Sequence, residues 1–484
     1  MAFGDLLETV GDTGRFQIVH CTLLALPVML MASHNLLQNF VAYVPSHHCA
    51  PPSNLSRSPL SLQETLRVTV PLDKMGKLHR CQRYTTPQWH LLDNNNTAVE
   101  HEVTEGQLQD CSDGWIYIMN ERTSSIISDW DMVCGLRSLK QMSQTVYMGG
   151  VLVGAFLFGS LSDRYGRRLL LIISYLLMGV CGTCAAFAPN FSLFCLFRFG
   201  CGMALSGQGL NTFSLIVEWI PTRVRTVIGT LTGYCYTVGQ LLFALIAYFV
   251  RDWRWLILTV SLPMYVFFLM SWWVHESSRW LVLNHQPERA ITNLKSVARI
   301  NGRREEGEKL DLKVVQESMQ KEMSSSKGTY TILDLFKTPT MRNMTISLST
   351  VWFSTSFAYY GIAMDLQKFG VDMYLIQVIF GCADIPAKLI ITISMGIFGR
   401  RRSQAGALFS AGICILINLL VPNDKQMLRT AMAVVGKGCL AFILTLNINK
   451  TVNKMQMKEL MLHCDCGGSK IMPIHLNNHS LKCE

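Results

Sequence analysis

The stretch GSLSDRYGRR, residues 159–168, lies between two long apolar segments and decides the fold of this chain. Gly159 and Gly166 lack a Cβ, so they permit a close approach of helices and a tight turn. Asp163 can pair with basic groups at neighbouring helix ends and latch one conformation; otherwise the turn only sets topology. The basic positions of the turn are Arg164, Arg167 and Arg168. A shorter turn of the same kind, GIFGRRR at 396–402, follows a later apolar segment and predicts two halves of related topology.

The composition is that of a protein embedded in a lipid bilayer. Of the 484 residues, 50% are apolar and 16% are charged, whereas soluble chains carry about 25% charged residues. This excludes a disordered or fibrous protein and most cytosolic enzymes. Helices of ~20 apolar residues cross the hydrocarbon core, and ten spans are predicted at 16–37, 141–161, 169–187, 193–217, 227–249, 255–274, 344–363, 373–395, 404–421 and 428–446. The first has no basic leader or small-residue cleavage site and is interpreted as a retained span.

Basic residues gather in the loops after the second, fourth and eighth spans, and they orient the chain. The last two of these loops hold Arg223, Arg225 and Arg400 to Arg402. Cytoplasmic loops carry an excess of Lys and Arg, so these loops and the N-terminus are predicted to be cytoplasmic. They hold most of the net charge of +10, which makes nucleic-acid binding the weaker explanation.

The spans divide the chain into two unequal halves. A six-span half is predicted over 1–274, including a long extracellular loop at 38–140, and a cytoplasmic helical loop over 275–343. An incomplete second half over 344–446 and a divergent tail over 447–484 follow.

The loop at 38–140 has the features of an oxidising, glycosylated extracellular face. Two disulfides, with three pairings open, are predicted among its four cysteines, Cys49, Cys81, Cys111 and Cys134. Sequons at Asn54 and Asn95 predict N-linked glycans. A third sequon, at Asn478, falls in a tail that ten spans place in the cytoplasm. A glycan on Asn478 would therefore contradict the span count.

Two further motifs lie at predicted cytoplasmic helix ends. Glu218 and Arg225 belong to EWIPTRVR, which closes the fourth span, and HESSRWL at 275–281 follows the sixth. These charges are either solvated helix ends or parts of a cytoplasmic latch. Because all three motifs follow even-numbered spans, the latch is favoured, and together they identify a fold.

Charged residues inside apolar spans cost about 2.5–3.5 kcal/mol each at a helix centre, so they are candidate substrate contacts. Asp384 and Lys388 are one turn apart on the eighth span, close enough to pair. They form a structural pair, or Lys388 faces a central cavity and attracts an anion, which we favour. Lys437, in the tenth predicted span, either attracts an anion as Lys388 would or only contacts backbone carbonyls at a glycine-flanked kink. Arg198 is interpreted as a packing or gating cation rather than a ligand.

Aromatic residues cluster on the fifth and seventh spans. They either pack or bind an amphipathic aromatic anion through stacking and O–H donation. The candidates are Tyr234, Tyr236, Trp352, Tyr359 and Tyr360. His34 and Asn35, near the outer end of the first span, line the substrate route or cap the helix, and we favour the route.

The three cytoplasmic motifs together resemble the major facilitator superfamily. Similarity to solute carrier family 22, and within it to the organic anion transporters, rests on residues 1–8, 31–40, 111–117, 130–134, 357–361 and 384–388. The resemblance covers 1 to about 441 and implies an all-α fold with about ten of the usual twelve spans. It also implies exchange of small organic anions for intracellular dicarboxylates across the plasma membrane. Lys388 and the tyrosines would bind the substrate between two rocking halves.

After Ala441 the chain departs from this family pattern, and no further apolar run of spanning length follows. The chain as written is therefore expected to be core-glycosylated and to transport poorly. Organic cation transport is one alternative, against which a buried Lys388 argues. The other is a non-transporting truncated isoform, retained in the endoplasmic reticulum or acting as a partner protein.

Enzyme motifs are missing from the sequence. It has no P-loop, dinucleotide-binding fingerprint or G-x-S-x-G motif. We therefore predict no enzymatic activity, no ATP-driven pumping and no cofactor. The run HCDC at 463–466 has poor spacing for zinc, and no metal site is predicted.

Overall fold

The computed structural model describes residues 3–52, 61–73, 76–92, 107–119, 124–313, 315, 334–364, 366–369, 371–422 and 425–444. The sequons at Asn54, Asn95 and Asn478 and the tail at 447–484 lie outside the described residues.

Six spanning segments form the first half of the molecule: α2 (Arg15–Val41), α5 (Ser138–Tyr165), α6 (Arg167–Ala186), α7 (Phe191–Trp219), α8 (Thr222–Phe249) and a segment made of α9 (Trp253–Ser261), α10 (Pro263–Met270) and η3 (Ser271–Trp273). Local sequence sets where they begin. Asn190 caps α7 by accepting a hydrogen bond from the Leu193 N–H at 2.9 Å. The sixth segment divides at Pro263, which has no N–H to donate.

Four more long helices follow in the second half: α16 (Pro339–Ala363), α17 (Met373–Ile397), α18 (Gly399–Leu420) and the helix Gln426–Leu444. Eight helices in the described part are long and apolar enough to cross a membrane. The other two predicted spans are α16 and α18, which have 25 and 22 residues. At about 1.5 Å per residue, both exceed the ~30 Å hydrocarbon thickness.

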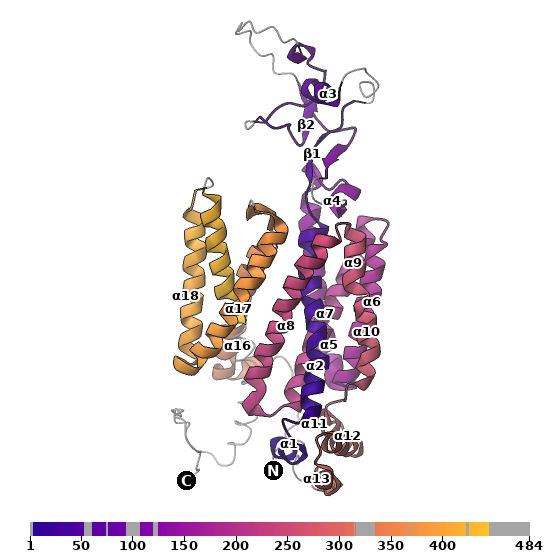
Figure 1. Ribbon diagram of the computed structural model, residues 1–484, viewed down its shortest axis with the longest axis vertical. Helices are drawn as coiled ribbons and strands as arrows, with labels where there is room; N and C mark the ends of the chain where they lie inside the picture. Colours follow the sequence, from indigo (N-terminus) through magenta and orange to yellow (C-terminus); the bar gives the residue numbers. More distant parts are fainter. Residues whose placement is uncertain are drawn as a thin grey trace.

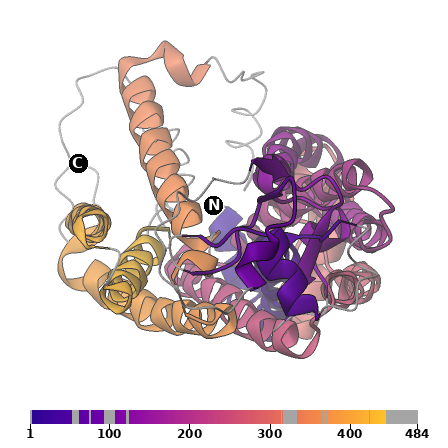
Figure 2. The same ribbon diagram turned by 90° about the horizontal axis from the view of Figure 1, so that it is seen from above.

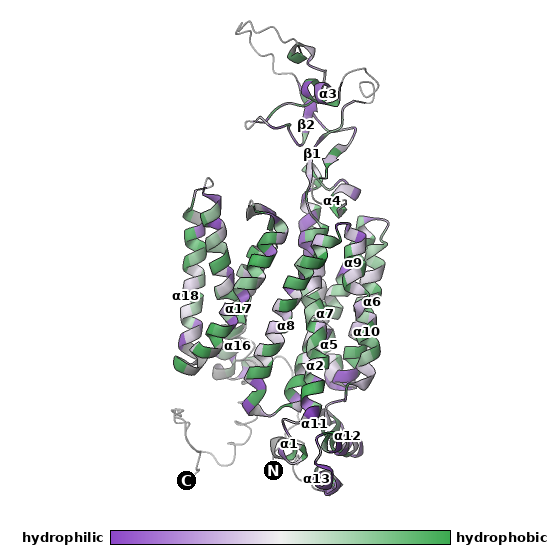
Figure 3. Cartoon of the chain, in the orientation of Figure 1, coloured by the Kyte–Doolittle hydropathy of each residue, from purple (hydrophilic) through white to green (hydrophobic). Residues whose placement is uncertain are grey.

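The spanning helices lie side by side, as Figure 1 shows, with an outer lobe beyond one end and short helices at the other. Seen from above, the helices of the second half form a group beside those of the first (Figure 2). The two groups meet where α8 packs against α17. Hydrophobic residues predominate along the spanning helices in Figure 3. Phe249 and Phe357, for example, are 73% and 75% exposed, as expected of side chains that face lipid.

Glycines let α5 and α7 approach closely. A Cβ on Gly150 would lie 2.2 Å from the Phe199 carbonyl oxygen, and one on Gly202 would lie 2.2 Å from that of Tyr147. Gly159 differs, because a Cβ there would meet nothing within 4 Å. The prediction that Gly159 supports a close helix approach is therefore wrong.

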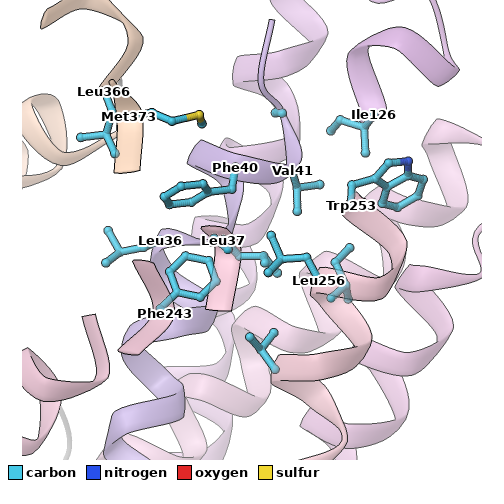
Figure 4. Close-up of a cluster of buried hydrophobic side chains, with 14 of the residues drawn as sticks. Leu36, Leu37, Phe40, Val41, Ile126, Phe243, Trp253, Leu256, Leu366 and Met373 are labelled. Carbon is cyan, nitrogen blue, oxygen red and sulfur yellow. The ribbon is translucent and has the colours of Figure 1, made fainter. Parts of the chain in front are cut away.

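The largest apolar cluster joins the two halves near their outer ends (Figure 4). Phe40 of α2 packs edge-on against Phe243 of α8, with ring centroids 5.2 Å apart. It also lies 5.5 Å from the ring of Tyr374, at the start of α17. Leu366 and Met373 extend the cluster on the side of the second half. This contact closes the outer side of the molecule.

The outer lobe contains two small sheets, which the all-α prediction did not include. Strand β1 (Ser46–Cys49) pairs antiparallel with β4 (Trp115–Ile118), and β2 (Gln82–Tyr84) pairs with β3 (Leu108–Asp110). The expected two disulfides are present, as Cys49–Cys111 and Cys81–Cys134. The short helices of the lobe are α3 (Leu62–Thr69), η1 (Trp89–Leu92), α4 (Ile126–Asp129) and η2 (Cys134–Leu136).

Short helices cover the end of the first half that lies opposite the outer lobe and is predicted to be cytoplasmic. They are α1 (Phe3–Val10), α11 (Ser278–Leu283), α12 (Pro287–Ile300) and α13 (Arg304–Glu308). The apolar face of α1 packs on α12, and the Asn301 side chain bonds the turn after α1, donating to the Gly11 carbonyl at 2.8 Å. Two further short helices, α15 (Asp334–Lys337) and η4 (Leu366–Phe369), flank α16.

Candidate functional site

Lys388 lies at the junction of the two halves. It is on α17 and is only 6% exposed. Its ammonium group donates hydrogen bonds to α8, to the Gly233 carbonyl at 2.6 Å and to the Thr237 hydroxyl. The ring of Tyr234, also on α8, has its centroid 5.9 Å from Nζ. The Tyr234 hydroxyl donates across the same junction to the Ile385 carbonyl at 3.4 Å.

Asp384, one turn before Lys388, has an ion-pair partner that the sequence did not identify. Its carboxylate lies 3.4 Å from Nζ of Lys437, on the helix Gln426–Leu444, and both side chains are buried. Lys437 also donates to the Phe380 carbonyl at 3.2 Å. The predicted carbonyl contact of Lys437 is therefore present, in addition to a charge partner.

Counting charges in this cluster gives a net positive site. Two ammonium groups, of Lys388 and Lys437, are buried here with one carboxylate, that of Asp384, which pairs with Lys437. A buried charge is tolerated when it is paired, and an excess charge favours a ligand of opposite sign. The cluster therefore has an electrostatic preference for an anion.

Asn35 connects the first span to the tyrosines of α8. Its amide Nδ2 donates to the Tyr236 hydroxyl at 3.2 Å, and its Oδ1 accepts from the Tyr147 hydroxyl at 3.0 Å. Asn35 is within a continuous helix, α2, and makes side-chain bonds toward the helix bundle. Its geometry is that of a residue in the polar interior, not of a helix cap.

Two more predicted tyrosines lie on the facing helix, α16. Gln240 of α8 donates to the Tyr359 hydroxyl at 3.1 Å, and the rings of Tyr359 and Tyr360 pack edge-on at 5.5 Å. The Lys437 ammonium lies 5.6 Å from the centroid of the Tyr359 ring. Trp352, the remaining predicted aromatic, is half-buried two turns earlier on α16.

Sequence reasoning missed three side chains of this network: Tyr147, Thr237 and Gln240. Each is an uncharged polar residue within a largely apolar span, and such residues have no distinctive sequence signal. A buried polar group needs a partner, so such residues are recognised only when their partners are seen.

The cytoplasmic motif at 159–168 is held by residues from two other segments. Arg167 pairs with Asp163 at 3.0 Å and with Glu218, at the end of α7, at 3.5 Å. Glu276 accepts hydrogen bonds from the backbone N–H groups of Arg167 and Arg168, at 3.2 and 3.0 Å. A carboxylate at the N-terminus of α6 also interacts favourably with the helix dipole.

Other residues of the predicted latch have smaller roles. Arg168 donates to the Trp272 carbonyl at 2.7 Å, and Arg225 donates to the Ile220 carbonyl at 3.3 Å. Arg164 is exposed and lies over the ring of Tyr165. Burial raises the pKa of Glu276, while the backbone N–H donors and Arg167 oppose that rise.

We expect Gly166→Ala to destabilise this cluster and Gly159→Ala to leave it intact. Gly166 has φ +102°, and a Cβ there would lie 2.4 Å from Oε2 of Glu276. Backbone of this type costs other residues about 1–3 kcal/mol. Melting of the purified protein should therefore move to lower temperature for Gly166→Ala only. Equal melting temperatures of the two variants would show that the cluster does not depend on glycine at position 166.

Comparison of the sequence with known proteins identifies a transporter family. The family model described as "Sugar (and other) transporter" matches residues 90–451. Solute carrier family 22 member 6 of Pseudopleuronectes americanus is 67% identical over 91% of this chain and 80% of the relative. The same-named protein of Danio rerio is 66% identical over 91% of this chain and 79% of the relative. The chain belongs to solute carrier family 22, within the sugar (and other) transporter family.

The fold of this family 22 carrier has a counterpart among solved structures. The xylose transporter XylE of E. coli, in a partially occluded inward-open conformation, matches with a TM-score of 0.55 and 14% identity. The match covers 92% of this chain and 88% of XylE. The predicted major facilitator fold is thereby confirmed. The family to which the chain belongs is one of multi-pass membrane transporters.

Proposed function

We propose that this family 22 carrier moves small organic anions across the plasma membrane in exchange for intracellular dicarboxylates. The observation that carries the proposal is Lys388, buried at the junction of the halves in a cluster of net positive charge. An organic cation would be repelled by that cluster, so the alternative of cation transport is disfavoured.

The tyrosines favour an aromatic anion. Tyr236 and Tyr359 each accept a hydrogen bond from a side-chain amide, which leaves each O–H hydrogen to donate to a carboxylate. Their rings, with that of Tyr360, offer apolar faces to an aromatic group. A carboxylate at Lys388 and a ring among the tyrosines would satisfy both parts of the site.

Exchange would use the contacts that Lys388 makes across the junction. Its ammonium group bonds Gly233 and Thr237 and so ties the two halves together. A carboxylate would replace these bonds and free the halves to rock. A dicarboxylate arriving from the cytoplasm would use the same cation, which couples the two fluxes.

Uptake of a labelled aromatic carboxylate by cells that express the full chain tests this proposal. We expect slow uptake, because the chain departs from the family pattern after Ala441, but uptake that is saturable and rises several-fold after the cells are preloaded with a five-carbon dicarboxylate. Uptake of an aromatic amine in place of the carboxylate would contradict anion transport. Carboxylate uptake that is indifferent to preloading would contradict exchange alone.

Polar contacts at the outer end hold the halves closed beside the apolar cluster of Phe40. The Gln367 side chain accepts from the Val44 N–H at 3.2 Å and donates to the Val44 carbonyl at 3.2 Å. It also accepts from Lys140 at 3.2 Å. Asn39 of α2 donates to the Ala363 carbonyl at 2.8 Å. These contacts would break when the site opens outward.

We expect Gln367→Ala to lower the KM for external substrate about 10-fold or more. Each hydrogen bond contributes about 0.5–1.5 kcal/mol, so losing those of Gln367 increases the outward-open fraction that external substrate binds. Gln141→Ala, on the exposed outer end of α5, is the control and should leave KM unchanged. An unchanged KM in Gln367→Ala would show that Gln367 does not hold the outer side closed.

A further inference from the structure

Arg198 is a buried cation that the proposed transport scheme does not use. It lies on α7 and is 1% exposed. Its guanidinium carbon is 4.2 Å from the centroid of the Tyr147 ring, and one of its NH₂ groups donates to the His34 carbonyl at 3.5 Å. Within the described residues, its Nε and Nη1 have no hydrogen-bond partner. The guanidinium group therefore contacts chiefly the face of the Tyr147 ring.

Tyr147 connects this cation to the proposed substrate site. The ring is fully buried, and its hydroxyl donates to Oδ1 of Asn35 at 3.0 Å. Nδ2 of Asn35 donates in turn to the Tyr236 hydroxyl at 3.2 Å. A continuous chain of contacts thus runs from Arg198 to a hydroxyl group at the junction of the halves.

The direction of this chain determines what Tyr236 offers to a ligand. In the direction seen, Tyr236 accepts from Asn35, and its own hydrogen is left to donate to an anion. If the Asn35 amide were turned over, Oδ1 would face Tyr236 and take that hydrogen. Tyr236 would then present only lone pairs, which suit a cation or a neutral donor.

Arg198 selects between these two directions. A cation over the face of a phenol is attracted by its π electrons and withdraws electron density from the ring. The Tyr147 hydroxyl becomes a better donor and a poorer acceptor. It therefore favours Oδ1 of Asn35 over Nδ2 as its neighbour, and Oδ1 is the atom found there. Low local dielectric strengthens this effect.

We propose that Arg198 is a positioning and specificity-determining residue, which acts through Tyr147 and Asn35 to make Tyr236 a hydrogen-bond donor toward anionic substrates. This inference rests on the proposed function, because it concerns the same substrate site. Arg198 does not touch the substrate. It sets the polarity of the residues that do.

The test measures binding by the purified full chain in lipid nanodiscs of a labelled aromatic carboxylate and of its neutral amide analogue. We expect Tyr147→Phe, which keeps the ring and removes the hydroxyl, to weaken carboxylate binding about 5- to 10-fold, as for one hydrogen bond. Amide binding should change by less than twofold. Tyr175→Phe removes the hydroxyl of another buried tyrosine of the same half and should change neither.

Arg198 itself is tested by Arg198→Met and Arg198→Lys. We expect Arg198→Met to reduce the carboxylate preference at least as much as Tyr147→Phe, and Arg198→Lys to restore part of it because the charge is kept. The double variant Arg198→Met/Tyr147→Phe should be no weaker than Arg198→Met alone, since both act through one chain. If Arg198→Met does not fold, the carboxylate preferences of Arg198→Lys and Tyr147→Phe still test the inference.

Two results would overturn the inference alone, and a third would overturn it together with the proposed function. If the unaltered chain binds the carboxylate and Tyr147→Phe binds it equally well, Arg198 has no route to the site and the inference alone is wrong. If Tyr147→Phe weakens carboxylate and amide equally, the role of Tyr147 is structural and the inference is again wrong. If the unaltered chain does not bind the carboxylate, the proposed function fails and this inference fails with it.

Discussion

Replacing Lys388 with methionine is expected to lower kcat/KM for an aromatic carboxylate about 10- to 150-fold. The substitution keeps the length and apolar stem of the side chain but removes the charge. Hydrogen bonds to charged groups contribute about 1.5–3 kcal/mol, which corresponds to that range. The bonds to Gly233 and Thr237 that tie the halves together are lost as well. Affinity should fall while spontaneous reorientation of the empty carrier becomes faster.

Two further variants show whether the effect comes from the charge at position 388. Lys388→Arg keeps the charge but replaces a compact ammonium with a planar fork, so partial activity is expected. Lys309→Met removes an exposed lysine of the cytoplasmic end, whose side chain is 71% exposed, and should be neutral. Uptake and surface expression are measured together. Normal transport by Lys388→Met would show that Lys388 is structural.

Asp384→Asn is expected to prevent accumulation of folded protein. The substitution leaves two buried ammonium groups, those of Lys388 and Lys437, and removes the carboxylate that pairs with Lys437. Breaking a buried ion pair from one side costs about 3–5 kcal/mol, which is a large part of the stability of a typical protein. Folded protein is measured as the monodisperse fraction in detergent.

A second substitution should rescue that defect. Asp384→Asn/Lys437→Met removes one charge of each sign, so the cluster keeps its net charge of +1 and Lys388 keeps its place. We expect the double variant to accumulate as folded protein and to retain part of its anion binding. Glu308→Gln, in an exposed pair with Arg304, is the control and should have no measurable effect. Normal folding of Asp384→Asn alone would show that the two buried lysines do not need the Asp384 carboxylate.

Much of this fold could be predicted because membranes constrain sequence strongly. Only helices and closed barrels satisfy the backbone in lipid, so each apolar segment of spanning length predicted a helix. Thus 169–187 is α6 (Arg167–Ala186), and 373–395 lies within α17. The turn at 159–168 added what hydropathy lacks, because its charges identify the cytoplasmic end of a particular helix pair.

The partners of the buried charges could not be predicted, because they come from helices far apart in the sequence. Asp384 and Lys388 are close along α17, which suggested a pair, but Lys437 reaches the same carboxylate from another helix. Arg198 gave no indication of its contact with Tyr147 for the same reason. The prediction of a close helix approach at Gly159 is wrong because a Cβ there would meet open space. A local motif does not reveal which residues of other helices will pack against it.

The measurement that tests the central claim most directly compares two labelled compounds of the same shape and opposite charge. One is an aromatic carboxylate, and the other is the corresponding aromatic amine. Initial uptake of each is measured in cells that express the full chain, alongside the Lys388→Met variant. We expect slow but saturable uptake of the carboxylate, still less of the amine, and loss of the carboxylate uptake in the variant. Uptake that favours the amine, or carboxylate uptake that survives in Lys388→Met, would contradict an anion site built on Lys388.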